Sequence, residues 1–154
     1  MDLKEEIVST AKYILIGLIL AMAINTSLGM ALQADKPIMA VVSNSMVPVF
    51  SKGDLIVVKG LECEKIDVGD IIVYLNPQRN IPIVHRVVEI DYDSQGDPVF
   101  TTKGDNNGHT DQSSGISAPV RCEWVRGRVR LIIPKLGLFK VGLIELSNSI
   151  RSYV

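Results

Sequence analysis

The run from Tyr13 to Ala34 constrains the fold of this 154-residue chain more than any other feature, because it contains no charged residue. Its length matches the roughly 20 residues that an α-helix needs to cross the hydrocarbon core of a bilayer. A cleaved signal peptide is the competing interpretation, with Gly29-Met30-Ala31 as a small-x-small cleavage site. However, a signal peptide begins with a basic segment, whereas residues 1–12 carry both acidic and basic side chains. We therefore predict a retained transmembrane anchor over residues 13–34, preceded by a short helical segment, 1–12.

After the anchor, short apolar segments alternate with turns rich in Gly, Asp, Asn and Ser. Strands are predicted at Ile38–Val42, Leu55–Lys59, Ile71–Leu75, Ile83–Ile90 and Val99–Lys103, with a last strand pair within Val120–Ile133. Many short strands without a long central helix are typical of an antiparallel β-domain, here over residues 35–133. The predicted fold class is therefore mainly β.

The C-terminal segment, residues 134–154, differs from the β-domain in its pattern. Pro134 ends the last predicted strand, because proline lacks the amide hydrogen that strand pairing needs. Beyond it, Leu136, Phe139, Leu143 and Leu146 recur at helical spacing. The segment carries too many charges and glycines for a second span. An amphipathic helix lying on the membrane or on the β-domain fits this pattern.

Charge and cysteine content narrow the classes of function. The net charge is −1, whereas nucleic-acid-binding domains usually present a strongly basic face, so no nucleic-acid partner is expected. The two cysteines, Cys63 and Cys122, lack the C-x-x-C spacing of a metal site. They form either one disulfide, if the domain lies outside the cytoplasm, or two buried thiols. Between these two alternatives we expect thiols.

Two residues of the β-domain have side chains suited to nucleophilic catalysis. Ser45 ends the turn Ser43-Asn44-Ser45 directly after the first strand, and its hydroxyl is a candidate nucleophile if a base reaches it. On local sequence alone, ordinary turn hydrogen bonding is the more common role of such a serine. His85 lies within a predicted strand, where a lone histidine is more often structural. An imidazole nevertheless accepts protons near neutral pH.

The turn-rich loop Lys103–Asp111 supplies Asp105, Asp111 and a second histidine, His109. A carboxylate behind a histidine fixes its tautomer and stabilises the imidazolium, although aspartate is also a common turn former. The loop fails the EF-hand pattern, which needs an acidic residue at its twelfth position, here Ile116. No ligand from a third segment completes a transition-metal site, so no metal is expected.

Five segments occur in an order that is more specific than any of them alone. They are SNSMVPVF, KGDLIVV, VGDIIVY, IVHRVVEI and FTTKGDNN, with Asp111 six residues beyond Asp105. In this order they resemble the type I signal peptidases. Through the histidine in HRVV, the chain resembles the subgroup found in archaea, in the endoplasmic reticulum and in some sporulating bacteria, since the common bacterial enzymes have a lysine there. The resemblance covers about Ile38 to Val129.

The resemblance implies a role for each matching residue. Ser45, before Met46, corresponds to the nucleophile, and His85 to the general base. Asp111 corresponds to the third member of a Ser-His-Asp site. Ser43 corresponds to a hydroxyl that helps bind the oxyanion, and Asp105 to a second acidic residue with a supporting role. His109 corresponds to no functional position.

The same resemblance implies a bent antiparallel β-structure and a membrane-bound serine endopeptidase that cleaves signal peptides after small residues, without a cofactor. Its partners would be preprotein signal peptides and the lipid bilayer, and association with the secretion translocon is compatible with this role. Signal peptides emerge on the far side of the membrane, so the β-domain is expected outside the cytoplasm and residues 1–12 on the cytoplasmic side. The alternative is a catalytically idle, membrane-anchored β-domain that binds peptides or partner proteins.

Overall fold

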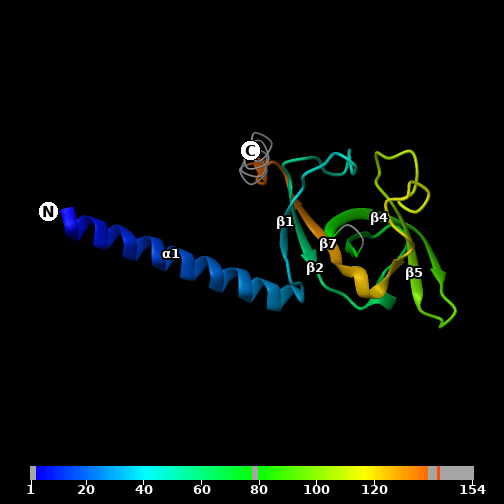
Figure 1. Cartoon of the computed structure of the whole chain (residues 1–154), viewed down its shortest axis with the longest axis horizontal. Coiled ribbons are helices and arrows are strands. Elements are labelled where there is room, and N and C mark those ends of the chain that lie inside the picture. The colour runs from blue at the N-terminus through cyan, green and yellow to red at the C-terminus, as the bar shows by residue number, and fades with distance from the viewer. Residues whose placement is uncertain (1–2, 78–79, 139–141, 143–154) are drawn as a thin grey trace.

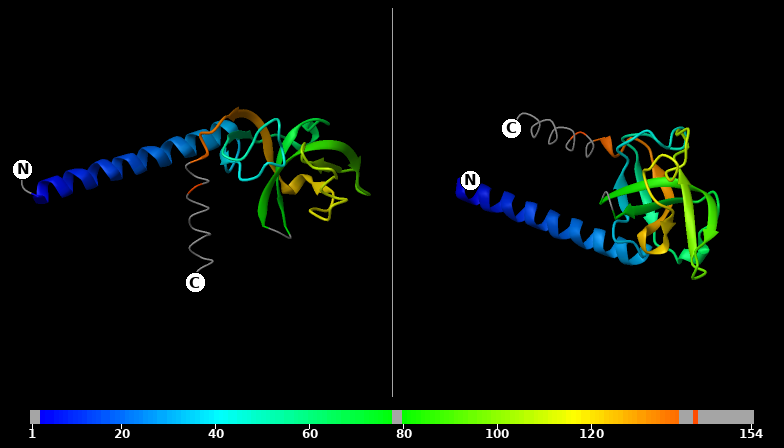
Figure 2. Two further views of the ribbon diagram at one scale, coloured as in Figure 1. Left: turned by 90° about the horizontal axis from the view of Figure 1, so that it is seen from above. Right: turned by 45° about the vertical axis from the view of Figure 1, so that its right-hand side comes forward.

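All but the last two residues of the uncharged run lie within one continuous helix, α1 (Leu3–Leu32), which projects from the β-domain as an isolated stalk (Figure 1 and Figure 2). The computed structural model describes residues 3–77, 80–138 and 142. Helix α1 is long and apolar enough to cross a membrane, and none of its apolar stretch is buried. It begins well before Tyr13, so it includes most of the predicted N-terminal segment. Glu5 and Glu6 in its first turn interact favourably with the helix dipole.

Seven strands form one antiparallel sheet in the order β1-β2-β7-β3-β4-β5-β6. Their bounds are β1 Ile38–Ala40, β2 Leu55–Lys59, β3 Ile71–Asn76, β4 Ile81–Tyr92, β5 Pro98–Lys103, β6 Val120–Arg121 and β7 Val125–Ile133. Two short 3-10 helices, η1 (Cys63–Lys65) and η2 (Cys122–Trp124), precede β3 and β7. The sheet curls strongly on itself in both further views (Figure 2). The prediction of a mainly β, antiparallel domain behind an apolar helix is confirmed.

The strand bounds differ from the prediction at two places that matter for the fold. The first strand ends at Ala40 rather than Val42, although the N–H of Val41 still donates to the Asp54 carbonyl at 2.9 Å. The segment Val120–Ile133 is not a paired hairpin. Instead η2 reverses the chain, β6 pairs with β5, and β7 lies between β2 and β3. Local alternation in the sequence identifies strands but not their partners.

The curled sheet encloses two apolar clusters, and β3 contributes to both. Val73 packs in one cluster, while Ile72 and Tyr74 pack in the other, because successive side chains of a strand point to opposite faces. The first cluster also holds Val41, Met46, Phe50, Ile56 and Val58. The second holds Ile66, Val87, Phe100 and Val120. Each cluster supports a different part of the site described below.

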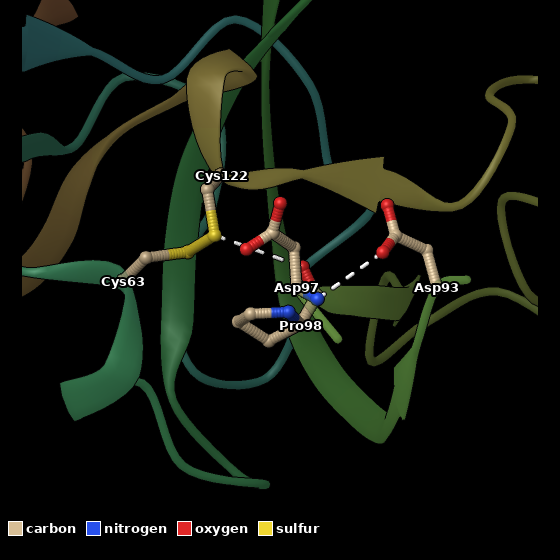
Figure 3. Close-up of a disulfide and its surroundings, with 5 residues drawn as sticks. All are labelled: Cys63, Asp93, Asp97, Pro98 and Cys122. Atoms are coloured by element: carbon tan, nitrogen blue, oxygen red, sulfur yellow. Dashed lines mark hydrogen bonds between the residues drawn. A yellow bond between two sulfur atoms is a disulfide. The ribbon is translucent and has the colours of Figure 1, made fainter. Parts of the chain in front are cut away.

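The expectation of free thiols is wrong, because Cys63 and Cys122 form a disulfide between η1 and η2 (Figure 3). Their Cα atoms are 5.6 Å apart, within the range that a disulfide spans. Both cysteines pack against the second apolar cluster. The reversal of the chain at η2 brings them together across 59 residues of sequence, and this reversal has no signal in the sequence.

The predicted C-terminal amphipathic helix falls mostly on residues outside those that the structure describes, and it stays a prediction. The described start of this segment is attached to the β-domain through Asp54. One carboxylate oxygen of Asp54 accepts from the backbone N–H of Lys135 at 2.9 Å, and the other accepts from the N–H of Ser51 at 2.8 Å. Asp54, only 6% exposed, therefore joins the turn before β2 to the chain after β7.

Replacing Asp54 with Asn is expected to lower the free energy of unfolding by about 1–3 kcal/mol, because an amide has one acceptor oxygen for two N–H groups. The N–H groups of Ser51 and Lys135 lower the pKa of Asp54. Since the folded-state pKa lies below that of the unfolded chain, the carboxylate stabilises the fold above about pH 4, and this contribution is lost as pH falls through the folded-state pKa. Urea unfolding of wild type and variant in detergent at pH 7 and pH 3 measures both effects.

Asp93 provides the matched control. Its Oδ1 atom accepts both from the N–H group of Gln95 at 2.8 Å and from that of Asp97 at 3.1 Å. Figure 3 shows the bond from Asp97. An asparagine oxygen replaces that single acceptor, so Asp93→Asn should unfold close to wild type. Equal losses for the two variants would contradict the role given to Asp54.

Candidate active site

Ser45 lies in the turn that follows β1, and the next residue fixes this turn on the core. Met46 is 1% exposed and belongs to the first apolar cluster. Its carbonyl accepts hydrogen bonds from the N–H groups of Val49 at 2.9 Å and Phe50 at 3.2 Å. Ser45 itself is half-buried. Burial of Met46 therefore holds the backbone in place while the serine hydroxyl stays at the surface of the domain.

His85 approaches this hydroxyl from the middle of β4. It is 6% exposed, and on its strand it shares a face with Val87 of the second apolar cluster. Its Nε2 atom lies 3.0 Å from Ser45 Oγ, within hydrogen-bond reach. The turn after β1, an edge strand, and the inner strand β4 are thus brought together by the curl of the sheet.

Asp111 lies behind His85 and is completely buried. Its Oδ2 and Oδ1 atoms are 2.7 Å and 2.9 Å from His85 Nδ1. Burial by itself would raise the pKa of Asp111, but hydrogen bonds from His85, Thr102 and Tyr74 outweigh it and lower the pKa. The carboxylate is therefore ionised at neutral pH, and it holds the Nδ1–H tautomer that leaves Nε2 free to accept a proton.

Tyr74 and Thr102 are site residues that the sequence did not reveal. The Tyr74 hydroxyl donates to Asp111 Oδ2 at 2.9 Å, and the Thr102 hydroxyl donates to the same atom at 2.6 Å. Burial, foremost, and the nearby Asp111 charge raise the pKa of Tyr74, so it remains a donor. The only signal in the sequence is a polar side chain at an inward-facing position of each strand.

Asp105, the other acidic residue of the loop, makes no hydrogen bond to His85. Its carboxylate pairs with Arg86 through two bonds, of 2.9 Å from Nε and 2.6 Å from Nη2. Arg86 also donates to the carbonyl of Gly69 at 2.7 Å. Because Arg86 follows His85 on β4, its side chain points to the opposite face. Asp105 therefore ties the loop to β4 from the side away from Asp111.

The loop also docks directly on the serine turn. The N–H of Asn106 donates to the Ser45 carbonyl at 2.8 Å, and its side chain donates to the Asn44 carbonyl at 3.2 Å. A Cβ atom at Gly104 would lie 2.7 Å from the Ser45 carbonyl oxygen and 2.9 Å from His85 Nε2. Gly104 is thus required for the close approach of three segments of the site.

Ser43 lies beside Ser45, with the two hydroxyl oxygens 3.2 Å apart. The backbone N–H of Ser45 donates to no described residue. A hydroxyl and a free N–H next to a nucleophile are the donors that an oxyanion hole uses. The geometry is therefore compatible with the oxyanion role that the family resemblance implies for Ser43.

A groove of about 540 Å³ runs past these side chains between β1 and the start of β4. Its lining is mainly apolar and includes Ser43, Ser45 and His85. Strand β1 pairs only with β2, and Ile81–His85 of β4 pair only with β3. Both walls therefore present backbone groups that no described strand uses.

The remaining sequence candidate, His109, is exposed and makes no hydrogen bond with a described residue. Among residues 3–77, 80–138 and 142, no three His, Cys, Asp or Glu side chains lie close enough together to hold a metal ion. The structure thus brings together Ser43, Ser45, His85 and Asp111, and it places Asp105 and His109 apart from them.

Comparison with known proteins identifies relatives, although no protein-family model matches the chain. The chain is 37% identical over 131 residues to the signal peptidase complex catalytic subunit of Scheffersomyces stipitis, covering 81% of this chain and 76% of that protein. It is 32% identical over 139 residues to the corresponding subunit of Schizosaccharomyces pombe, covering 77% and 73%. The Homo sapiens subunit is 36% identical over 110 residues, and the chain spans 57% of its length.

These matches confirm the resemblance to the endoplasmic-reticulum type of signal peptidase. They cover most of both chains for the two fungal proteins. The chain therefore belongs to the family of signal peptidase complex catalytic subunits.

Proposed function

We propose that the chain is a membrane-anchored serine endopeptidase that cleaves signal peptides from preproteins. The observation that carries this proposal is the continuous series of hydrogen bonds from Ser45 through His85 to Asp111, at 3.0 Å and 2.7 Å. A serine, a base and an orienting carboxylate in this geometry are the elements of nucleophilic acyl transfer. A catalytically idle peptide-binding domain has no need for this alignment beside its groove.

In the first step, Ser45 Oγ attacks the scissile carbonyl carbon and passes its proton to His85 Nε2. Asp111 stabilises the imidazolium that forms, without taking up the proton itself. The Ser45 N–H and the Ser43 hydroxyl donate to the oxyanion. His85 then returns the proton to the leaving amine, and water hydrolyses the acyl-enzyme through the same base.

The groove supports an extended peptide as the substrate. An extended segment placed between β1 and Ile81–Val84 can use the unpaired backbone groups of both walls, as in strand addition to a sheet edge. The apolar lining fits the apolar region of a signal peptide. The substrate class is therefore inferred from backbone pairing and apolar contact together.

Helix α1 is proposed to anchor the chain with the β-domain outside the cytoplasm. The Cys63–Cys122 disulfide supports this orientation, because disulfides persist in oxidising compartments. Names of the relatives describe subunits of a signal peptidase complex. We therefore propose that further subunits of such a complex are partners of the chain. We also propose that the chain associates with the secretion translocon.

Ser45→Ala and His85→Ala should each lower cleavage of a preprotein by about four to six orders of magnitude, and the double variant should be little worse, because such residues act as a unit. N-terminal sequencing of products formed by the detergent-solubilised chain measures this. The control is Ser113→Ala, at an exposed position in the loop between β5 and β6. This variant should cleave the preprotein normally. Near-normal turnover by Ser45→Ala, free of wild-type enzyme, would falsify the proposal.

Substrate choice gives a second test. The family resemblance implies small side chains at the first and third positions before the cut, since a shallow pocket excludes bulk by steric clash. Replacing Ala with Phe at the first position of a good substrate should abolish cleavage at that bond. A Phe placed two residues after the cut serves as the control. Equal rates with Ala and Phe at the first position would show that the pocket is not selective.

Asp111 and Asp105 should differ when each is replaced by Asn. In Asp111→Asn, the amide oxygen still accepts from Thr102 and Tyr74, but the amide nitrogen faces His85 Nδ1 and favours the wrong tautomer. We expect kcat to fall roughly 10⁴-fold with the fold retained. In Asp105→Asn, one of the two guanidinium N–H groups of Arg86 that pair with the carboxylate loses its acceptor oxygen. The melting temperature should therefore fall, while kcat changes about tenfold or less. A stable but inactive Asp105→Asn protein would assign the orienting role to Asp105 instead.

A further inference from the structure

A positively charged pocket of about 190 Å³ lies where α1 meets the β-domain. Its lining comes from Gln33 directly after α1, from the turn after β2, which includes the carboxylate of Glu62, and from four cations: Lys59, Lys65, Arg128 and Arg130. An adjoining hollow adds Arg126 and Asp35. None of the residues that line this pocket also lines the groove beside Ser45. The two sites are therefore separate.

Two glycines allow the close backbone contacts that hold the pocket together, one of them at the end of the helix. The N–H of Gly60 donates to the Leu32 carbonyl at 2.8 Å, and a Cβ atom at Gly60 would collide with the Gln33 carbonyl. Gly127, with φ 144°, lets β7 approach the backbone of Lys59 closely. Because backbone contacts hold the junction, the cations keep a fixed position relative to the end of the apolar helix.

Not all of this positive charge is neutralised within the domain. Lys65 pairs with Glu62 and Arg128 with Asp70, both at 2.7 Å. Lys59 and Arg130 are exposed and form no ion pair with a described residue.

Arg128 also has donor capacity to spare, since its buried Nε donates to no described residue. The negative end of the α1 dipole accounts for part of the attraction of cations to this place. It does not account for all of it, because the effect of the dipole falls off within the last turn of the helix.

We propose that this pocket binds the phosphate of an anionic phospholipid headgroup. The apolar part of α1 ends directly at the pocket, so a helix that crosses the bilayer places these cations at headgroup level. Arginine forks and lysine ammonium groups are the side chains that bind phosphate oxygens, and a negatively charged membrane surface attracts them. The inference requires that α1 enters a membrane, but it does not depend on peptidase activity.

The test titrates the full chain in a non-ionic detergent with dihexanoyl phosphatidylglycerol, with dihexanoyl phosphatidylcholine, and with inorganic phosphate. Native mass spectrometry counts the retained lipids, and the melting temperature reports binding independently. One phosphatidylglycerol should be retained in preference to phosphatidylcholine, and it should raise the melting temperature more. Equal retention of the two lipids would overturn the proposal. Equal stabilisation by inorganic phosphate would identify a free-anion site and overturn the lipid assignment.

A double variant isolates the pocket. Lys59→Gln with Arg130→Gln should weaken phosphatidylglycerol binding by about tenfold to thirtyfold, since each cation near an anionic surface contributes about fivefold. Lys103→Gln with Arg121→Gln removes the same charge elsewhere on the domain and should bind like wild type. Lys59→Arg with Arg130→Lys should also retain binding. Unchanged affinity in the first double variant would refute the site, and preprotein cleavage, measured separately, tests the peptidase proposal alone.

Discussion

The hydrogen bond between buried Asp111 and His85 is the interaction on which the rest of the site depends. A fully buried carboxylate is costly unless its charge is compensated. Here His85, Thr102 and Tyr74 compensate it from three strands, β4, β5 and β3. The backbone pairing of these strands brings the three side chains to the same carboxylate. The same set of hydrogen bonds thus compensates the buried charge and orients the imidazole.

The serine reaches this imidazole because the loop after β5 joins the turn after β1. Asn106 holds the Ser45 carbonyl, and Gly104 leaves room for that contact beside His85. The Arg86–Asp105 pair fixes the other side of the loop. Adjacent residues of β4, His85 and Arg86, therefore secure two ends of one loop from opposite faces of the sheet. The two aspartates of the loop have different partners for this reason.

The parts that could be predicted from the sequence are those with local signals. Alternating apolar residues located most strands, and the order of five short segments indicated the family together with Ser45 and His85. Partners across the sheet depend on register, which the sequence does not state, so the contacts of Tyr74 and Thr102 with Asp111 were not predicted. The Cys63–Cys122 disulfide was missed for the same reason, because it depends on the chain reversal at η2.

The junction between α1 and the β-domain also determines where the groove lies relative to the helix. The N–H of Gly60 holds the Leu32 carbonyl, and the N–H of Val58 holds the Pro37 carbonyl at 2.9 Å. Strand β1 begins at the next residue, Ile38, and forms one wall of the groove. A short linker bonded at one end to β2 and at the other to the residue that follows it leaves little freedom between helix and groove. Any membrane that contains α1 therefore sets the height of the groove above its surface through backbone hydrogen bonds.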